Sequence, residues 1–73
     1  MNMIKTNINN NNYGVTFKFN GHHTEGYDKN GKWICNIFAT WNIKGVEHIK
    51  VIAKDVHDEW IPTTSLFERL GFE

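Results

Sequence analysis

Two Asn-Gly pairs, at positions 20–21 and 30–31, constrain this chain more than any other feature of its sequence. Asn-Gly between alternating segments is a strong signal for a β-hairpin, because a type I′ turn needs positive φ at both central residues. Before the first pair, Val15, Phe17 and Phe19 alternate with polar residues, which is typical of a half-buried strand. The sequence therefore predicts consecutive antiparallel strands joined by tight turns.

If both pairs form two-residue loops, a register for three strands follows. Phe17 then faces Thr24, and Tyr27 faces Ile34. In this register, the side of the sheet that carries Phe17 and Phe19 also carries an unbroken apolar row in the third strand. That row consists of Trp33, Cys35, Ile37, Ala39 and Trp41. We therefore expect this side to be the core face.

A third break, at residues 43–45, suits a three-residue hairpin loop that ends on a glycine in the left-handed position of a bulge. This loop turns Ile49, Val51 and Ala53 of a fourth strand toward the core. A two-residue loop would instead bury Lys50, which is costly for an unpaired charge. The sequence therefore favours the three-residue loop.

The sequence after the fourth strand changes character. The acidic stretch 55–59 is expected to be a loop, and Pro62 is expected to lie beyond the sheet because it cannot donate to a ladder. Ser65 with Glu68 forms a capping-box pattern, and Gly71 is a natural helix stop. A helix of about seven residues is too short to be stable alone in water. It is therefore expected to dock on the open apolar face of the sheet.

These elements predict an α+β fold, a four-stranded antiparallel meander with one C-terminal helix packed on one face. Helix and sheet each have one apolar side, and the two sides cover each other. The residues expected to be buried between them are Trp33, Ile37, Trp41, Phe17, Phe19, Val51 and Leu66.

The chain divides into an N-terminal segment and one domain. Residues 1–12 combine low complexity with four consecutive Asn, and Asn is poor in helix and strand interiors. We expect a flexible tail or edge segment there, unless Ile4 and Ile8 dock it against the domain. Residues 13–73 are expected to form a single two-layer domain, because a chain of 73 residues has room for one core.

The single cysteine, Cys35, excludes an intrachain disulfide and suits a reducing compartment. The N-terminus has no apolar run of signal-peptide length, and no window reaches the ~18 to 20 apolar residues of a membrane span. We therefore expect a cytoplasmic protein with no membrane partner.

Chemistry-bearing residues do not form a recognisable catalytic motif. Cys35 lies within an apolar row, where burial makes a thiol inert. His22, His23, His48 and His57 lack the spacing of zinc ligands. A two-layer domain of this size also offers little concavity for paired carboxylates. We therefore expect no enzyme activity, no catalytic residue, no metal site and no cofactor.

The same register places an aromatic and aliphatic patch on the face opposite to the core. Its members are Tyr27, Ile34, Phe38 and Ile52, with Trp60 as an extension from the acidic stretch. Apolar anchors surrounded by polar residues are typical of interface cores. We therefore expect a protein-binding surface, which could also be covered by the N-terminal segment or by a second copy in a homodimer.

Lysines around this patch support an alternative function. They are Lys18, Lys32, Lys50 and Lys54. Aromatic side chains on a sheet with flanking lysines can stack single-stranded bases, so single-stranded nucleic acid is the alternative partner. The formal net charge of zero makes nucleic acid the less favoured of the two.

The composition indicates a general class of protein. A small, neutral, aromatic-rich chain without catalytic motifs is typical of accessory and inhibitor proteins. The abundance of Asn, Ile and Lys is the bias of AT-rich coding sequence, which is common among phages and mobile elements. By this analogy we expect a small phage-type protein that binds and blocks a host enzyme of defence or nucleic-acid processing.

Overall fold

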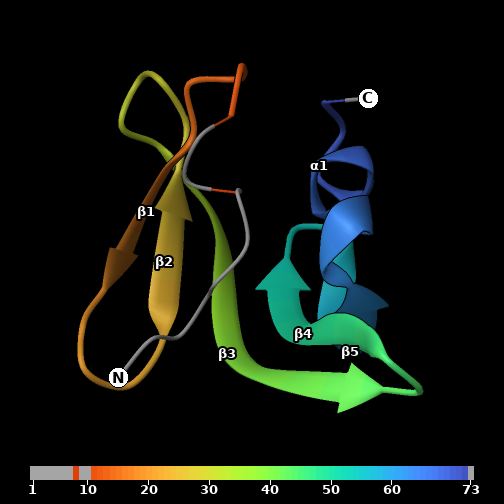
Figure 1. Cartoon of the computed structure of the whole chain (residues 1–73). Helices are drawn as coiled ribbons and strands as arrows, with labels where there is room; N and C mark the ends of the chain where they lie inside the picture. The colour runs from red at the N-terminus through yellow and green to blue at the C-terminus, as the bar shows by residue number, and fades with distance from the viewer. Residues whose placement is uncertain (1–7, 9–10, 73) are drawn as a thin grey trace.

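The structure is a computed structural model that describes residue 8 and residues 11–72. Within these residues the chain forms one antiparallel sheet whose strands are neighbours in sequence order, followed by a short helical segment (Figure 1). The strands are β1 (Thr16–Phe19), β2 (Thr24–Tyr27), β3 (Trp33–Ile43), β4 (Val46–Ala53) and β5 (Val56–Pro62). A 3-10 turn, η2 (Thr63–Ser65), leads into the helix α1 (Leu66–Arg69). The predicted meander with a C-terminal helix is confirmed, but the sheet has five strands instead of four.

The fifth strand comes from the acidic stretch, which sequence analysis wrongly assigned to a loop. In β5, Ile61 pairs with Ile49, and Trp60 pairs with Lys50. Ile61 and Val56 are buried, so the strand has an apolar side in spite of its charges. Pro62 is the last residue of β5 at the edge of the sheet, where its missing N–H breaks no ladder.

The first hairpin differs from the predicted one by two residues. Phe19 pairs with Thr24, so the loop is longer than two residues. Asn20 folds this loop with its side chain, because Oδ1 accepts hydrogen bonds from the backbone N–H groups of His22 and His23 at 2.9 and 3.0 Å. A shift by two residues leaves each side chain of β1 and β2 on the predicted face.

A bulge at the start of β3 exchanges two residues between the faces. Gly26 pairs with Cys35, but the next residue of β2, Tyr27, pairs with Trp33, which leaves Ile34 as the extra residue. Ile34 is half-buried and packs against the core. The predicted pairing of Tyr27 with Ile34, which put Ile34 on the open face and Trp33 in the core, is therefore wrong.

A second bulge lies in the middle of β3. Ile37 pairs with Val51 as predicted, but beyond this point Thr40 pairs with Ile49 and Trp41 with His48, so the register shifts at Phe38. The β3–β4 hairpin consequently closes with a two-residue loop, Lys44 and Gly45, whose φ angles are 52° and 83°. The predicted three-residue loop is wrong, because a bulge allows the short loop without burying Lys50.

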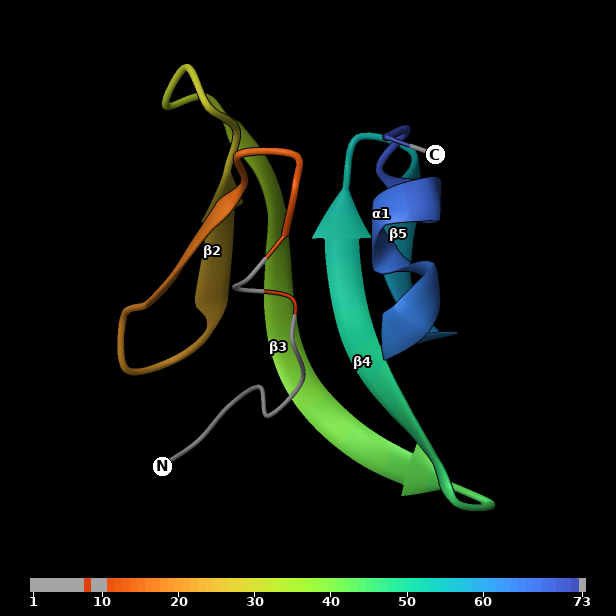
Figure 2. The ribbon, with the colours of Figure 1, turned by 45° about the horizontal axis from the view of Figure 1, so that its top comes forward.

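The core lies between the sheet and α1. Leu66 of α1 is fully buried in one cluster with Cys35, Ile37, Ile49 and Val51. The other buried members of the cluster are Ile8, Ala53, Val56 and Ile61. The helix therefore covers one face of the sheet, while β3 bends along its length and carries the sheet from β2 round to β4 (Figure 2).

The predicted core residues have different outcomes. Ile37, Val51 and Leu66 are buried, and Phe17 is half-buried against the core. Three aromatic residues of the predicted core are instead exposed, namely Phe19, Trp33 and Trp41, with 48%, 42% and 60% of their surface accessible. The two tryptophans lie outside the core because of the bulges in β3. Trp33 precedes the first bulge and Trp41 follows the second, and each bulge places the tryptophan on the side away from the core.

The N-terminal segment contributes to the core through Ile8, which is 6% exposed. The side chain of Asn11 links the backbone on either side of it, since Nδ2 donates to the carbonyl oxygens of Ile8 and Val15 at 2.7 and 3.0 Å. The burial of Ile8, one of the two contacts proposed from the sequence, is therefore observed. Ile4, the other proposed contact, lies outside the described residues.

The C-terminal end is held by aromatic contacts and not by the predicted capping box. Ser65 makes no side-chain hydrogen bond at the start of α1. After Gly71, with a φ of 93°, the N–H of Phe72 donates to the Phe67 carbonyl at 2.8 Å. Tyr13 packs on both rings, with centroid distances of 4.9 Å to Phe67 and 5.2 Å to Phe72. In the part of the chain that the structure describes, no helix has the length and apolar character needed to cross a membrane.

Gly26 supplies the first prediction, because a side chain does not fit there. An added Cβ would lie 2.7 Å from Cys35 Sγ and 3.2 Å from Phe17 Cε1. We expect Gly26→Ala to lower the free energy of unfolding by about 1–3 kcal/mol in urea denaturation, as overpacking of a core usually does. Cys35→Ala removes the nearer clash, so the same substitution should cost less in that background. An equal cost in both backgrounds would contradict the close approach.

Candidate protein-binding face

The side of the sheet opposite to α1 carries most of the exposed large apolar side chains. Those exposed in the described residues are Phe19, Trp33, Phe38, Trp41, Ile43, Val46 and Trp60. Because side chains alternate along a strand, the register puts all of them except Phe19 on the side away from the buried Ile49 and Val51. We call this side the uncovered face.

A hairpin patch at the far end of the uncovered face consists of Trp41, Ile43, Val46 and Trp60. Ile43 pairs with Val46 beside the turn. The rings of Trp41 and Trp60 meet edge to face, with centroids 5.6 Å apart and an interplanar angle of 81°. Trp41 is 60% exposed, so this contact does not remove it from water. Exposed clusters of large apolar residues are candidates for interaction sites.

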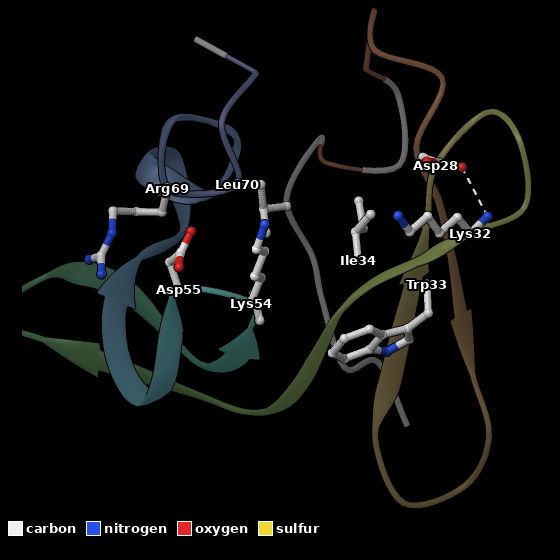
Figure 3. A pocket seen from close by; sticks show the side chains of 9 residues that line it. Asp28, Lys32, Trp33, Ile34, Lys54, Asp55, Arg69 and Leu70 are labelled. Atoms are coloured by element: carbon white, nitrogen blue, oxygen red, sulfur yellow. Dashed lines mark hydrogen bonds between the residues drawn. The ribbon is translucent and has the colours of Figure 1, made fainter.

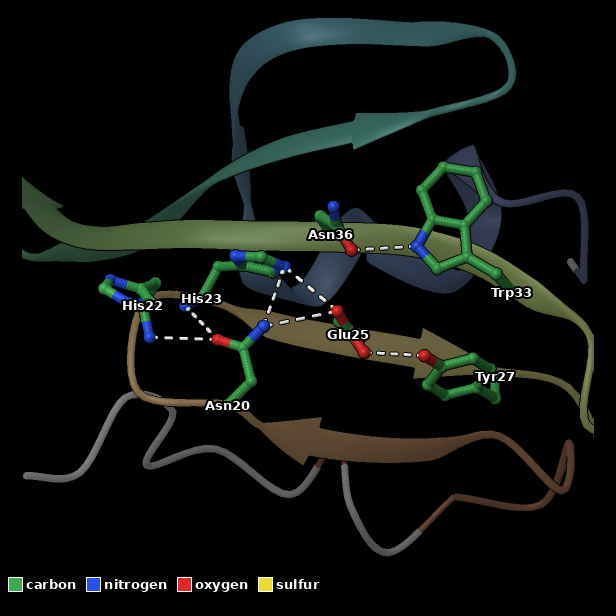
Figure 4. A network of polar contacts seen from close by, with 7 residues as sticks. All are labelled: Asn20, His22, His23, Glu25, Tyr27, Trp33 and Asn36. Atoms are coloured by element: carbon green, nitrogen blue, oxygen red, sulfur yellow. Dashed lines mark hydrogen bonds and ion pairs between the residues drawn. The ribbon is translucent and has the colours of Figure 1, made fainter.

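A polar cluster lies at the opposite end of the uncovered face and centres on Glu25 (Figure 4). Tyr27 donates its hydroxyl hydrogen to Glu25 Oε1 at 2.6 Å. The other oxygen, Oε2, lies 3.3 Å from Asn20 Nδ2 and 3.2 Å from His23 Nε2. The bond from Tyr27 is the main reason why the pKa of Glu25 lies below its ordinary value, and the same bond raises the pKa of Tyr27.

Aromatic rings border this polar cluster. The Trp33 indole donates from Nε1 to Asn36 Oδ1 at 2.8 Å, which fixes the ring on the uncovered face (Figure 4). The Lys18 ammonium lies 5.4 Å from the centre of the Tyr27 ring. The centroids of the His23 and Phe38 rings are 5.2 Å apart.

The predicted binding residues are only partly brought together. Tyr27, Phe38 and Trp60 lie on the uncovered face, and Ile52, half-buried, pairs there with Asn36. Ile34 is absent from it because of the first bulge. Sequence analysis missed Trp33, Trp41, Ile43 and Val46. A signal for the last two is present, since Lys44-Gly45 between β-branched residues can be read as a two-residue hairpin turn.

The predicted lysines do not form one basic ring. Lys18 lies over Tyr27, and Lys50 forms an ion pair with Asp58 at 3.4 Å. Lys32 and Lys54 line a cavity at the end of the sheet that lies away from the hairpin patch. The uncovered face therefore carries both signs of charge.

The remaining groups with nucleophilic or metal-binding potential are the Cys35 thiol and the His, Asp and Glu side chains. Cys35 is fully buried, and burial raises the pKa of its thiol to about 12. Within residue 8 and residues 11–72, His, Cys, Asp and Glu side chains form no group of three or more that could hold a metal ion.

No family model, curated protein sequence or solved structure matches this chain.

The hydrogen bond between Tyr27 and Glu25 gives the second prediction. In the folded protein the pKa of Glu25 lies below its ordinary value, and removal of the bond by Tyr27→Phe should raise this pKa. A carbon-detected NMR titration of the carboxyl group would show the change. Because the folded-state pKa is the lower one, the stability from this bond is present above the unfolded pKa and is lost as pH falls through the folded pKa. Tyr27→Phe should therefore lose less stability on acidification.

A matched control is Tyr13→Phe, which removes the hydroxyl group from a ring that packs on Phe67 and Phe72 and not beside Glu25. This variant should leave the titration of Glu25 unchanged. A titration of Glu25 that is the same in wild type and Tyr27→Phe would contradict the assigned cause.

Proposed function

We propose that this protein is a non-enzymatic binding module whose protein partner docks on the uncovered face. The observation that carries the proposal is the hairpin patch, where Trp41, Ile43 and Val46 of the β3–β4 hairpin are exposed together with Trp60 of β5. Tryptophan is enriched among the residues that dominate binding energy in protein interfaces. An unliganded domain exposes such a group at a cost that a partner can offset.

The surroundings of the patch support a protein partner. Lys50 and Asp58 form an ion pair beside Trp60, and His48 pairs with Trp41 across β3 and β4. An apolar centre with a polar, mixed-charge border is the usual anatomy of a protein interface. The two-residue turn at Lys44 and Gly45 joins the two strands that carry Ile43 and Val46 of the patch.

The biological role we propose is that of a cytoplasmic accessory or inhibitor protein of phage or mobile-element type, which covers part of a host enzyme. The small size and the Asn-, Ile- and Lys-rich composition support this role. A module of this kind acts by occupying a surface and needs no chemistry of its own.

Single-stranded nucleic acid is the second candidate, favoured by the exposed rings of Trp33, Phe38 and Trp41, which bases could stack on. The charges support it less well. Lys50 is engaged with Asp58, and Lys32 and Lys54 line the cavity at the end of the sheet. Phosphate binding would show as an affinity that falls steeply with salt.

The third prediction tests the hairpin patch directly. Immobilised wild-type protein should retain a discrete protein from nuclease-treated host lysate, and the double variant Trp41→Glu/Val46→Glu should lose it, because two carboxylates would be desolvated at the centre of the interface. Phe19→Glu is the matched control, since Phe19 is 48% exposed but belongs to the opposite side of the sheet. Circular dichroism verifies that each variant is folded.

Equal retention by wild type and a folded Trp41→Glu/Val46→Glu variant would contradict the proposal, and so would a wild type that retains no protein. Retention that disappears with nuclease treatment would favour the nucleic-acid candidate.

A further inference from the structure

A cavity of about 410 Å³ lies at the end of the sheet away from the hairpin patch. It arises because the β3–β4 pairing begins at Cys35 and Ala53, so that Trp33 and Ile34 continue past the end of β4. The end of α1 lies on the other side, where Leu70 joins the lining. The volume is within the range of small-molecule sites, about 300–1,000 Å³.

The inner surface of this cavity is apolar and well supported. Ile34 and Leu70 are half-buried and pack against the core, and Ala53 is part of it. Trp33 forms a flat wall whose indole is held by its bond to Asn36 at 2.8 Å. The first β3 bulge creates this arrangement, since it turns Ile34 toward the core and Trp33 outward.

Two ammonium groups face this apolar surface. Figure 3 shows the side chains of Lys32 and Lys54 extending toward the gap between Ile34 and Leu70. Within the described part of the chain, neither lysine forms an ion pair. Their positive charges are therefore available to a ligand.

The other charged groups around the cavity have different positions or partners. Asp28 Oδ1 accepts hydrogen bonds from the backbone N–H groups of Asn30 and Lys32 at 2.8 and 2.9 Å. Arg69 points away from the gap and donates to both carboxylate oxygens of Glu59 at 3.0 and 3.1 Å. Asp55 lies on the same side as Arg69 (Figure 3). The charged side chains that extend toward the gap itself are therefore the two lysines (Figure 3).

We propose that this cavity binds a small aromatic carboxylate. The ring would stack on Trp33 and cover Ile34 and Leu70, and the carboxylate would meet the ammonium groups of Lys32 and Lys54. Aromatic rings favour offset or edge-to-face contact with an indole, and hydrogen bonds between ammonium and carboxylate are strengthened by charge. This site is separate from the hairpin patch, so it stands or falls independently of the proposed protein partner.

The test uses the full-length ¹⁵N-labelled protein and sodium 2-naphthoate as the probe, at about 0.15 M salt so that exposed charges are screened. Amide shifts in heteronuclear NMR spectra should saturate and should be largest at Ile34, Lys54 and Leu70. The neutral 2-naphthamide has the same ring and should bind about tenfold more weakly, because it lacks the charge-assisted hydrogen bonds.

Two matched double variants separate the site from general charge. Lys32→Gln/Lys54→Gln should weaken naphthoate binding about tenfold. Lys29→Gln/Lys44→Gln removes the same charge at positions that do not line the cavity and should leave the affinity unchanged. All four positions are exposed, so the fold is retained.

Three results would overturn the proposal. They are the absence of saturable shifts at millimolar naphthoate, equal affinity for naphthoate and naphthamide, and an unchanged affinity in the folded Lys32→Gln/Lys54→Gln variant.

Discussion

The conflict between two pairing requirements in β3 determines the shape of this protein. The core requires Ile37 beside Val51, whereas the tight turn at Lys44 and Gly45 requires Ile43 beside Val46. These two registers differ by one residue, and a one-residue shift would turn every following side chain to the other face. The bulge at Phe38 accommodates the difference, so that Ile49 and Ile61 stay in the core while the turn keeps its favoured geometry. β3 is also bent along its length, as expected for a strand that carries bulges (Figure 2).

The bulges also decide what the sheet offers to other molecules. Beyond Phe38, Trp41 lies on the uncovered face, where it meets Trp60 of β5. The first bulge brings Trp33 to the same face and turns Ile34 toward the core, which builds the apolar wall and floor of the cavity near Lys32 and Lys54. Both proposed binding surfaces thus arise from the same kind of backbone irregularity, one at each end of the longest strand. Bulges are common next to functional sites because they redirect side chains without changing the order of the strands in the sheet.

Much of the fold could be predicted from local pattern, and the functional face could be predicted only in part. Alternation and turn residues identified β1 to β4 and the C-terminal helix. The predicted pairing of Cys35 and Ile37 with β4 is correct, and both residues are small enough or apolar enough to be buried. The alternation of apolar and polar residues does not reveal a bulge. From Trp33 to Trp41 every second residue is apolar, yet in the structure these residues change twice from one face of the sheet to the other. The acidic residues around Asp58 concealed β5, where a positive φ of 55° at Asp58 accompanies a further register shift.

The exchange of faces in β3 can be tested through the pairing of Trp41 with β4. Cross-strand nuclear Overhauser contacts between backbone protons identify opposed residues in an antiparallel pair. With the bulge at Phe38, we expect contacts of Trp41 with His48 and of Ile43 with Val46, together with contacts of Ile37 with Val51. Contacts of Trp41 with Glu47 and of Asn42 with Val46 would show an unbroken register. In that case Trp41 would belong to the core side, and the hairpin patch would not exist.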